Sequence, residues 1–263
     1  MNNKQPWALI LGASSGFGEA SAIELARAGM NIFGVHLDRR DRLPKVEELQ
    51  EKIRAMGREA QFFNVNASDD QYRVETVEKV GQRLAAEPKG TLRVLLHSLA
   101  FGSLKPLAGA EQVVSRNQLE ITVNTMGHSL VYWVQDCLRA GFFEWGARIF
   151  AMTSEGGAKA VPNYGAVAAA KAALESYIRQ LAMELAPAGI TANAILAGVT
   201  DTPALRLIPG HEKLIEIAKK RNPHRRLTTP EDVARCIVAL SHPATYWMTG
   251  NTLHVDGGES IVG

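Results

Sequence analysis

The segment "ALILGASSGFGEASAIELARAG" (residues 8–29) joins a short apolar run, three glycines and an amphipathic stretch without interruption. The apolar run predicts a β-strand and the amphipathic stretch a helix. Gly12, Gly16 and Gly18 stand between them in a G-x3-G-x-G spacing. Tight strand–helix turns need glycine for positive φ, but glycines at a helix N-terminus also let the backbone approach a pyrophosphate. The segment therefore predicts a dinucleotide-binding turn, in a spacing that differs from the commoner GxGxxG.

The rest of the chain repeats this alternation of apolar runs and amphipathic stretches. Apolar runs predict strands at residues 8–11, 32–36, 61–65, 94–97, 149–152, 191–196 and 252–255. Strands that alternate with helices imply βαβ units, and runs that are apolar throughout imply burial on both faces. No Pro/Ser-rich linker, repeat or low-complexity segment divides the sequence. We expect an α/β fold: a single doubly wound domain over residues 1–263 with a parallel sheet.

Composition excludes several classes of partner. The chain has 263 residues, a net charge of +2 and no long basic run, so we expect no nucleic acid partner. Cys137 and Cys236 lie in apolar helical patterns and are interpreted as reduced core residues. The seven His residues show no metal-binding spacing, which predicts no metal. The N-terminal apolar run is too short for a signal peptide or a membrane span, so a cytoplasmic protein is expected.

The end of the second predicted strand, "FGVHLDRRDR" (residues 33–42), bears on the choice of dinucleotide. A carboxylate at this place favours a free ribose 2′-hydroxyl, and basic groups accommodate a 2′-phosphate. His36 takes the place of the carboxylate, and Arg39 and Arg40 follow, which favours NADP(H). Asp38 lies between His36 and the two arginines. An alternative interpretation of these charged residues is a solvated turn without a role in binding.

Six motifs together resemble the short-chain dehydrogenase/reductase family over nearly the whole chain. They are the glycine spacing, "VNT" (residues 123–125), Ser154, the pair Tyr164 and Lys171, "NAILAGVTDT" (residues 193–202) and "VDGGES" (residues 255–260). The resemblance implies a Rossmann-type sheet of about seven strands that uses NAD(P)(H) without a metal.

Two departures from common members narrow the resemblance. Tyr164 precedes Lys171 by seven positions instead of four, and "HSLAFG" (residues 97–102) replaces the usual Asn-Asn-Ala-Gly. In both features the chain resembles the divergent branch that contains the bacterial enoyl-acyl-carrier-protein reductases. Residues 200–234 resemble the NADPH-dependent type called enoyl reductase III. This resemblance implies reduction of an enoyl thioester carried on acyl carrier protein, by a homotetramer.

The Tyr–Lys spacing suits that reaction if both residues lie on one helix. Four positions turn a helix by ~400° and seven by ~700°, so both spacings keep the pair on nearly one face, with rises of ~6 and ~10.5 Å. An enoyl thioester takes hydride at C3 while negative charge develops on the thioester oxygen. The acid must therefore stand farther from the hydride than in a ketone reductase. We also expect Gly165, Val167 and Ala168 to leave room for the flat substrate.

The resemblance implies a role for each candidate catalytic residue. Tyr164 would donate to the thioester oxygen and stabilise the enolate. Lys171 would bind the ribose hydroxyls; its alternative is a surface lysine. Ser154 is either a hydrogen-bonding partner of cofactor or substrate, or a structural hydroxyl at a strand end. Asn124 is either part of a proton relay or structural.

Cofactor contacts are expected along five loops at the ends of the predicted strands and at Lys171. Asn66 takes the adenine position, with Asn64 as the alternative register, and Ala197 replaces the proline usual in the family. The candidate cofactor-binding residues are Gly12, Ser14, Ser15, Gly16, Phe17, Gly18, His36, Arg39, Arg40, Asn66, Ser98, Ala100, Lys171, Gly198, Val199 and Thr202.

Residues 202–220 are expected to form a mobile lid over the acyl chain, because prolines and a glycine surround two short apolar turns. Its apolar side chains would line an acyl pocket or pack as an ordinary helical insertion: Leu205, Leu207, Ile208, Leu214 and Ile217. The apolar helices predicted at residues 129–138 and 168–185 would pack across subunits of the tetramer.

Three functions remain open from the sequence. The first is NADPH-dependent reduction of an enoyl thioester. The second is reduction of a carbonyl compound or hydroxysteroid, and the third is a non-catalytic NADP-binding sensor.

Overall fold

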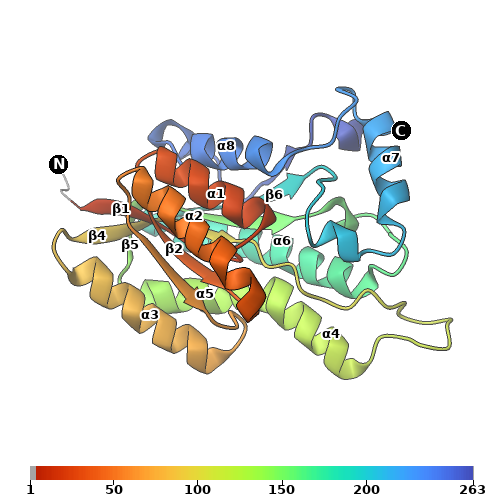
Figure 1. The fold of residues 1–263 in the computed structure, drawn as a ribbon, viewed down its shortest axis with the longest axis horizontal. Helices are drawn as coiled ribbons and strands as arrows, with labels where there is room; N and C mark the ends of the chain where they lie inside the picture. The colour runs from red at the N-terminus through yellow and green to blue at the C-terminus, as the bar shows by residue number, and fades with distance from the viewer. Residues whose placement is uncertain (1–3, 263) are drawn as a thin grey trace.

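One parallel sheet of seven strands forms the centre of the molecule (Figure 1). The computed structural model describes residues 4–262, so residues 1–3 and 263 of the predicted domain lie outside it. The strands are β1 Gln5–Leu11, β2 Asn31–His36, β3 Ala60–Asn64, β4 Gly90–His97, β5 Phe143–Thr153, β6 Thr191–Ala197 and β7 Thr252–Val255. The predicted fold class is confirmed, and each predicted strand is present.

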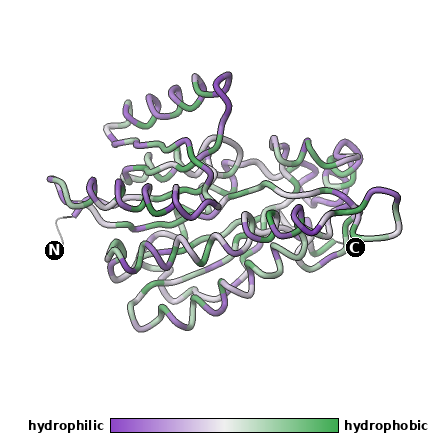
Figure 2. The backbone as a smooth tube through the Cα atoms, turned by 90° about the horizontal axis from the view of Figure 1, so that it is seen from below, coloured by the Kyte–Doolittle hydropathy of each residue, from purple (hydrophilic) through white to green (hydrophobic). Residues whose placement is uncertain are grey.

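Helices cover both faces of this sheet. They are α1 Gly16–Arg27, α2 Leu43–Ala55, α3 Asp70–Ala85, α4 Arg116–Val123, α5 Ser129–Arg139, α6 Gly165–Leu185, α7 His211–Arg221 and α8 Pro230–Leu240. Helices α3, α5 and α6 pack on one face, and α1, α2 and α8 on the other. Purple and green alternate along these helices in Figure 2, as expected for amphipathic helices on a buried sheet.

Strand β1 shows why its sequence is apolar throughout. Trp7 and Leu9 pack on the face covered by α3, α5 and α6. Ala8 and Ile10 pack on the opposite face, and none of the four exposes any surface. Because both faces of the strand are covered, neither set of alternate positions can be polar.

The strand order places the candidate site. The strand order is β3-β2-β1-β4-β5-β6-β7. Strands β2 and β3 are added on one side of β1 and strands β4 to β7 on the other, so the strand order reverses between β1 and β4. Ligands of such sheets bind beyond the carboxyl ends of the strands at this reversal. Leu11 and His97 pair at these ends, so Gly12 and Ser98 follow side by side. In Figure 1, α7 and the loop before α4 lie at the end of the molecule opposite the N-terminus.

A buried arginine joins β5 to the end of α8. Arg148 is 1% exposed, and its guanidinium donates to the carbonyls of Leu240 and His242, each at 3.3 Å, and to Gly146 at 2.7 Å. Burial, with the charge of Arg93, lowers the pKa of Arg148 to about 10, so it is charged at neutral pH. The guanidinium therefore adds donors to two carbonyls at the end of α8, which also accept hydrogen bonds from Thr245, and to the carbonyl of Gly146.

Replacing Arg148 by Ala is expected to lower the free energy of unfolding by about 3–5 kcal/mol. The change removes a buried side chain that donates to three carbonyls, and it opens a cavity beside α8. Denaturant unfolding followed by circular dichroism would measure it. Arg139→Ala is the control, because that side chain is 70% exposed in an ion pair with Asp136 and should cost less than about 1 kcal/mol. Equal losses in the two variants would contradict this account of Arg148.

Candidate active site

The glycine turn after β1 has no room for side chains. Gly12 has φ +88°, and a β-carbon there would lie 2.5 Å from the carbonyl oxygen of Ser98. A β-carbon at Gly18 would lie 1.9 Å from the carbonyl oxygen of Gly12. Gly16 has φ +55° and faces the methyl group of Thr202, which would be 3.3 Å from its β-carbon. The turn therefore brings Ser98 and Thr202 against the start of α1.

The N-terminus of α1 follows this turn. Ser15 is its N-cap residue, and no side-chain hydrogen bond caps the helix there. Ser14, Ser15 and Phe17 are all partly exposed. Free N–H groups and the helix dipole at this end attract an anion such as a pyrophosphate. This turn of tightly packed glycines fits the pyrophosphate of a dinucleotide.

The turn after β2 carries the charged residues predicted to meet the adenosine ribose. The Nδ1 atom of His36 lies 3.0 Å from the Asp38 carboxylate, and the imidazole is buried. Burial lowers the pKa of His36, and Asp38 partly offsets this effect. Arg39 and Arg40 follow with exposed side chains that make no hydrogen bond or ion pair to any residue from 4 to 262.

Asn64 and Asn66, the two alternatives for the adenine position, have different partners. The side chain of Asn64 accepts from the Asp38 N–H at 2.9 Å and donates to the Asp38 carbonyl at 3.0 Å. The side-chain oxygen Oδ1 of Asn66 accepts from the N–H of Ser68 at 3.0 Å and from its hydroxyl at 2.8 Å. Asn64 thus holds the turn after β2, whereas Asn66 shapes the turn after β3.

Tyr164 and Ser154 meet at the carboxyl end of β5. The Tyr164 hydroxyl lies 3.3 Å from the Ser154 Oγ. A β-carbon on Gly156 would lie 2.5 Å from the Tyr164 ring, so this glycine lets the ring approach the backbone. Burial raises the pKa of Tyr164 above its usual value, although the Ser154 hydrogen bond opposes the shift. Tyr164 therefore stays protonated at neutral pH and can donate a hydrogen bond.

Tyr164 lies just before the helix and not within it. It is the N-cap residue of α6, and its carbonyl accepts from the Ala168 N–H at 2.7 Å. Val167, four positions before the lysine, is 3% exposed and packs with Met126 and Ala170. A tyrosine at the commoner spacing would have to enter this core. The seven-residue spacing is therefore built into the packing of α6.

The expected space for substrate beside α6 needs correction. The side chain of Leu107 would lie 2.6 Å from a β-carbon at Gly165, so it fills the space that this glycine leaves. Val167 is buried in the core and leaves no space either. The glycine accommodates a loop residue because the loop before α4 folds over the start of α6.

Lys171 lies in the second turn of α6 and is 4% exposed. Its Nζ atom donates to the carbonyl of Met152, in β5, at 2.7 Å. Burial lowers the pKa of Lys171 to about 8, and the charge of Glu175 opposes the shift. Lys171 is not a surface lysine, so that alternative is wrong. It lies on the side of α6 that packs against the sheet.

The loop after β6 holds the remaining predicted cofactor contacts. A β-carbon on Gly198 would lie 2.4 Å from the Thr228 hydroxyl. The Val199 N–H donates to the Glu259 carboxylate at 3.3 Å, and burial raises the pKa of Glu259. A cofactor contact through this N–H therefore requires Glu259 to release it. Thr202 is buried, and its hydroxyl accepts from the Leu205 N–H at 3.2 Å.

The segment that replaces Asn-Asn-Ala-Gly begins with a buried histidine. His97 Nε2 lies 2.8 Å from the Ser129 hydroxyl, while Nδ1 has no partner within residues 4–262. Burial and the charge of Lys171 lower the pKa of His97 to about 3, so it is neutral. Ser98 is partly exposed, and Ala100 beyond it is exposed. These two residues therefore lie outside the core, beyond the carboxyl end of β4.

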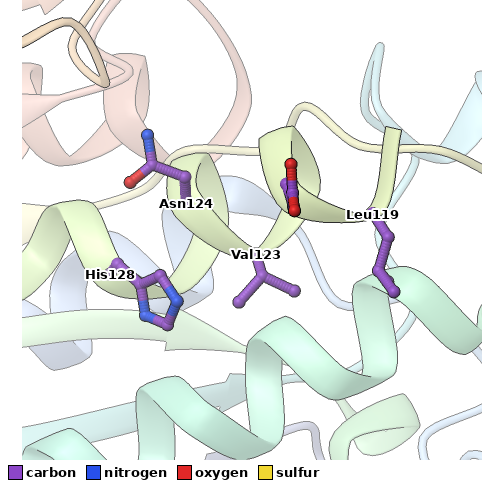
Figure 3. A pocket seen from close by; sticks show the side chains of 5 residues that line it. Leu119, Val123, Asn124 and His128 are labelled. Atoms are coloured by element: carbon purple, nitrogen blue, oxygen red, sulfur yellow. The ribbon is translucent and has the colours of Figure 1, made fainter. Parts of the chain in front are cut away.

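Asn124 begins a short π-helical segment, Asn124–His128. Its side-chain amide donates to the carbonyl of Ser68 at 3.3 Å. Asn124 also lines a hollow of about 460 Å³ together with Leu119, Glu120, Val123 and His128 (Figure 3). None of the three candidate catalytic residues lines this hollow, so we do not assign substrate to it. The hydrogen bond from the Asn124 side chain to Ser68 favours the structural alternative for Asn124.

The predicted lid contains a 3-10 turn, Leu205–Leu207, and most of α7. Leu207 is 73% exposed and Ile217 47%, whereas Leu205, Ile208 and Leu214 are partly buried. Arg221, at the end of α7, donates to Glu155 at 2.5 Å and to the Glu259 carbonyl at 2.6 Å. The base of this segment is thus tied to the turn after Ser154 and to the C-terminal turn.

Three residues at the site were not predicted: Glu155, Arg221 and Glu259. Glu155 and Arg221 are 66 positions apart, and no local pattern links them. Glu155 follows Ser154 and Glu259 lies within "VDGGES", which are the available sequence signals, whereas Arg221 has none. In the described part of the chain, no group of three or more His, Cys, Asp or Glu is placed to hold a metal ion.

A doubly wound sheet, a glycine turn at the β1–β4 reversal and a Ser–Tyr–Lys group beside it define the class of short-chain dehydrogenases/reductases. The family described as "Enoyl-(Acyl carrier protein) reductase" matches residues 12–260. The chain belongs to this family, whose enzymes are oxidoreductases that use a nicotinamide dinucleotide.

The names of relatives within the family give different cofactors, NADH for some and NADPH for others. The chain is 34% identical to "Enoyl-[acyl-carrier-protein] reductase [NADH] FabI" of Aquifex aeolicus, over 69% of this chain and 67% of that protein. It is 26% identical to "Enoyl-[acyl-carrier-protein] reductase [NADPH] FabI" of Staphylococcus aureus, over 93% and 91% of the two chains.

A solved structure of the same kind is similar over almost its full length. The Bacillus cereus enoyl-acyl carrier protein reductase with NADP+ and indole naphthyridinone superposes with a TM-score of 0.87. It is 26% identical in sequence, and the match covers 98% of this chain and 97% of that one. The predicted resemblance is confirmed at the level of family and fold.

Proposed function

We propose that this protein reduces a trans-2-enoyl thioester with NADPH, placing hydride on C3. The observation that carries this proposal is the position of Tyr164. Its hydroxyl lies beside Ser154 from the N-cap of α6, seven residues before the buried Lys171. Membership of the enoyl-(acyl carrier protein) reductase family supports the same reaction.

Each residue then has a chemical task. Bound NADPH would supply the hydride, with the glycine turn and the N-terminus of α1 holding its pyrophosphate. Lys171 would turn from the Met152 carbonyl to the ribose hydroxyls. Tyr164 would donate to the thioester oxygen and stabilise the charge that develops there. Ser154 would orient the Tyr164 hydroxyl, so we assign it a positioning role.

Exposed apolar side chains near the site suit an acyl chain. Phe101 and Leu107, in the loop before α4, are 68% and 55% exposed, and Leu107 packs over the residue next to Tyr164. Helix α7 of the proposed lid lies at the same end of the molecule as this loop (Figure 1), and Leu207 of the lid is 73% exposed. We propose that residues 202–220 close over the acyl chain and that acyl carrier protein delivers it. A homotetramer that pairs α5 and α6 across subunits belongs to the same proposal.

Replacing Arg39 and Arg40 together by Ala is expected to weaken NADPH binding about 10–100-fold. The variant would lose at least one charge-assisted hydrogen bond to the 2′-phosphate, and a bond of this kind is worth about 1.5–3 kcal/mol. NADH, which lacks this phosphate, should bind with little change. Titration of cofactor fluorescence measures both affinities.

The control for this variant is Arg42→Ala, which removes an exposed positive charge from the same turn. It should leave the ratio of the two affinities close to that of the unmodified protein. Tighter binding of NADH than of NADPH by the unmodified protein would overturn the proposed cofactor preference.

A pair of substrates of equal length separates the candidate reactions. With NADPH, crotonyl thioester should be reduced and acetoacetyl thioester should not, because the acid is placed for the thioester oxygen and not for a ketone oxygen. The opposite preference would favour the carbonyl reductase. Cofactor binding without turnover on either thioester or on a panel of ketones would favour the sensor.

A further inference from the structure

The turn after β2 holds a carboxylate in an unusual place for a site that takes a 2′-phosphate. Asp38 lies two residues beyond the end of β2 and directly before Arg39 and Arg40. A carboxylate at the end of this strand ordinarily accepts from a free 2′-hydroxyl and repels a phosphate. If its carboxylate pointed to the ribose, Asp38 would therefore oppose the preference that the arginines support.

Hydrogen bonds keep the Asp38 carboxylate from pointing toward the ribose. Its carboxylate lies 3.0 Å from His36 Nδ1, and only 10% of the Asp38 side chain is exposed. Asn64 binds both the N–H and the carbonyl of Asp38, at 2.9 and 3.0 Å. The backbone and the side chain of this residue are thus fixed from two neighbouring strands.

His36 is itself held rigidly. It is the last residue of β2, pairs with Asn64 in the sheet, and its carbonyl accepts from the Val65 N–H at 2.8 Å. Its ring lies 6.2 Å from that of Phe62 and is 4% exposed. A fixed imidazole therefore presents a fixed donor to the carboxylate.

We propose that His36 is a specificity-determining positioning residue. By binding the Asp38 carboxylate it turns this negative charge inward, and the exposed Arg39 and Arg40 are left to meet the 2′-phosphate. This inference rests on the proposed preference for NADPH. It assigns that preference to the orientation of Asp38 as well as to the presence of two arginines.

A matched pair of variants tests the donor. His36→Phe keeps an aromatic ring beside Phe62 but removes the donor, so Asp38 becomes free to turn outward. The ratio of NADPH to NADH affinity should fall by about 10-fold or more, because a unit negative charge near the phosphate costs at least about 1.4 kcal/mol at short range. His36→Asn places an amide N–H near the position of Nδ1 and should retain most of the ratio.

A second substitution shows whether Asp38 carries the effect. In the double variant His36→Phe with Asp38→Asn, no carboxylate remains to turn outward, so the affinity ratio should return to that of Asp38→Asn alone. The single Asp38→Asn variant should match or exceed the unmodified protein. Thermal melts and direct cofactor titrations of all four variants separate a loss of fold from a change of selectivity.

Each outcome bears on one proposal. If the unmodified protein prefers NADH, the proposed cofactor preference fails. If it prefers NADPH and folded His36→Phe keeps the full ratio, the role of His36 fails while the preference remains. If the double variant is as unselective as His36→Phe, the effect does not pass through Asp38, and the inference is also overturned.

Discussion

Tyr164→Phe is expected to lower the turnover of crotonyl thioester about 10²–10³-fold. The hydroxyl is the donor that we assign to the thioester oxygen, and the loss of one such donor typically costs about 3–4 kcal/mol in the transition state. Its raised pKa keeps the hydroxyl protonated, so the unmodified protein has this donor at every pH from neutral to mildly alkaline. Steady-state kinetics with saturating NADPH would measure the loss.

Cofactor binding separates this loss from damage to the fold. The glycine turn and Lys171 do not depend on the Tyr164 hydroxyl, so NADPH should bind Tyr164→Phe as it binds the unmodified protein. Ser154→Ala is the control, because it removes a neutral hydrogen bond at 3.3 Å and should cost less than about 10-fold. Unchanged turnover in Tyr164→Phe would show that another group provides the acid.

Lys171→Met is expected to reduce kcat/KM for NADPH by up to about 100-fold. Methionine keeps much of the apolar packing of a side chain that is 4% exposed but removes the charged donor proposed for the ribose. A hydrogen bond from a charged group is worth up to about 3 kcal/mol, which corresponds to about 100-fold. Both the Michaelis constant for NADPH and the turnover should change. Lys159→Met is the control, since that lysine is exposed in an ion pair with Glu155.

The same lysine predicts the alkaline limb of the pH profile. Burial lowers the pKa of Lys171 to about 8, so its positive charge is present below that pH and is lost as the pH rises through it. The profile of kcat/KM for NADPH, which reports the free enzyme, should decline above pH 8. Lys171→Met should lack this decline. A decline that persists in the variant would assign the titration to another group.

Features that depend on local pattern were predictable from the sequence. The central strands are buried on both faces, so a strand such as β1 appears in the sequence as an apolar run. The glycine turn was predictable because Gly12 and Gly18 adopt positions where any β-carbon would meet backbone. The placement of Tyr164 and Lys171 at the start of one helix was predictable, because the two residues are close in the sequence.

Features that depend on contacts between distant segments were not predictable. Leu107 covers Gly165 from another loop, and Glu259 accepts from Val199 across the end of the sheet. The sequence also left the orientation of Asp38 open, because a carboxylate two residues from a histidine can turn toward it or toward solvent. Only the folded turn, held by Asn64 from the neighbouring strand, distinguishes the two.

The position at which hydride arrives tests the central claim most directly. NADPH labelled with deuterium on its reactive nicotinamide carbon can be supplied with crotonyl thioester, and the product analysed by mass spectrometry and NMR. We expect saturated butyryl thioester with deuterium on C3 and a solvent proton on C2. An unreduced crotonyl thioester, alongside deuterium transfer to the keto carbon of acetoacetyl thioester, would contradict enoyl reduction and identify a carbonyl reductase.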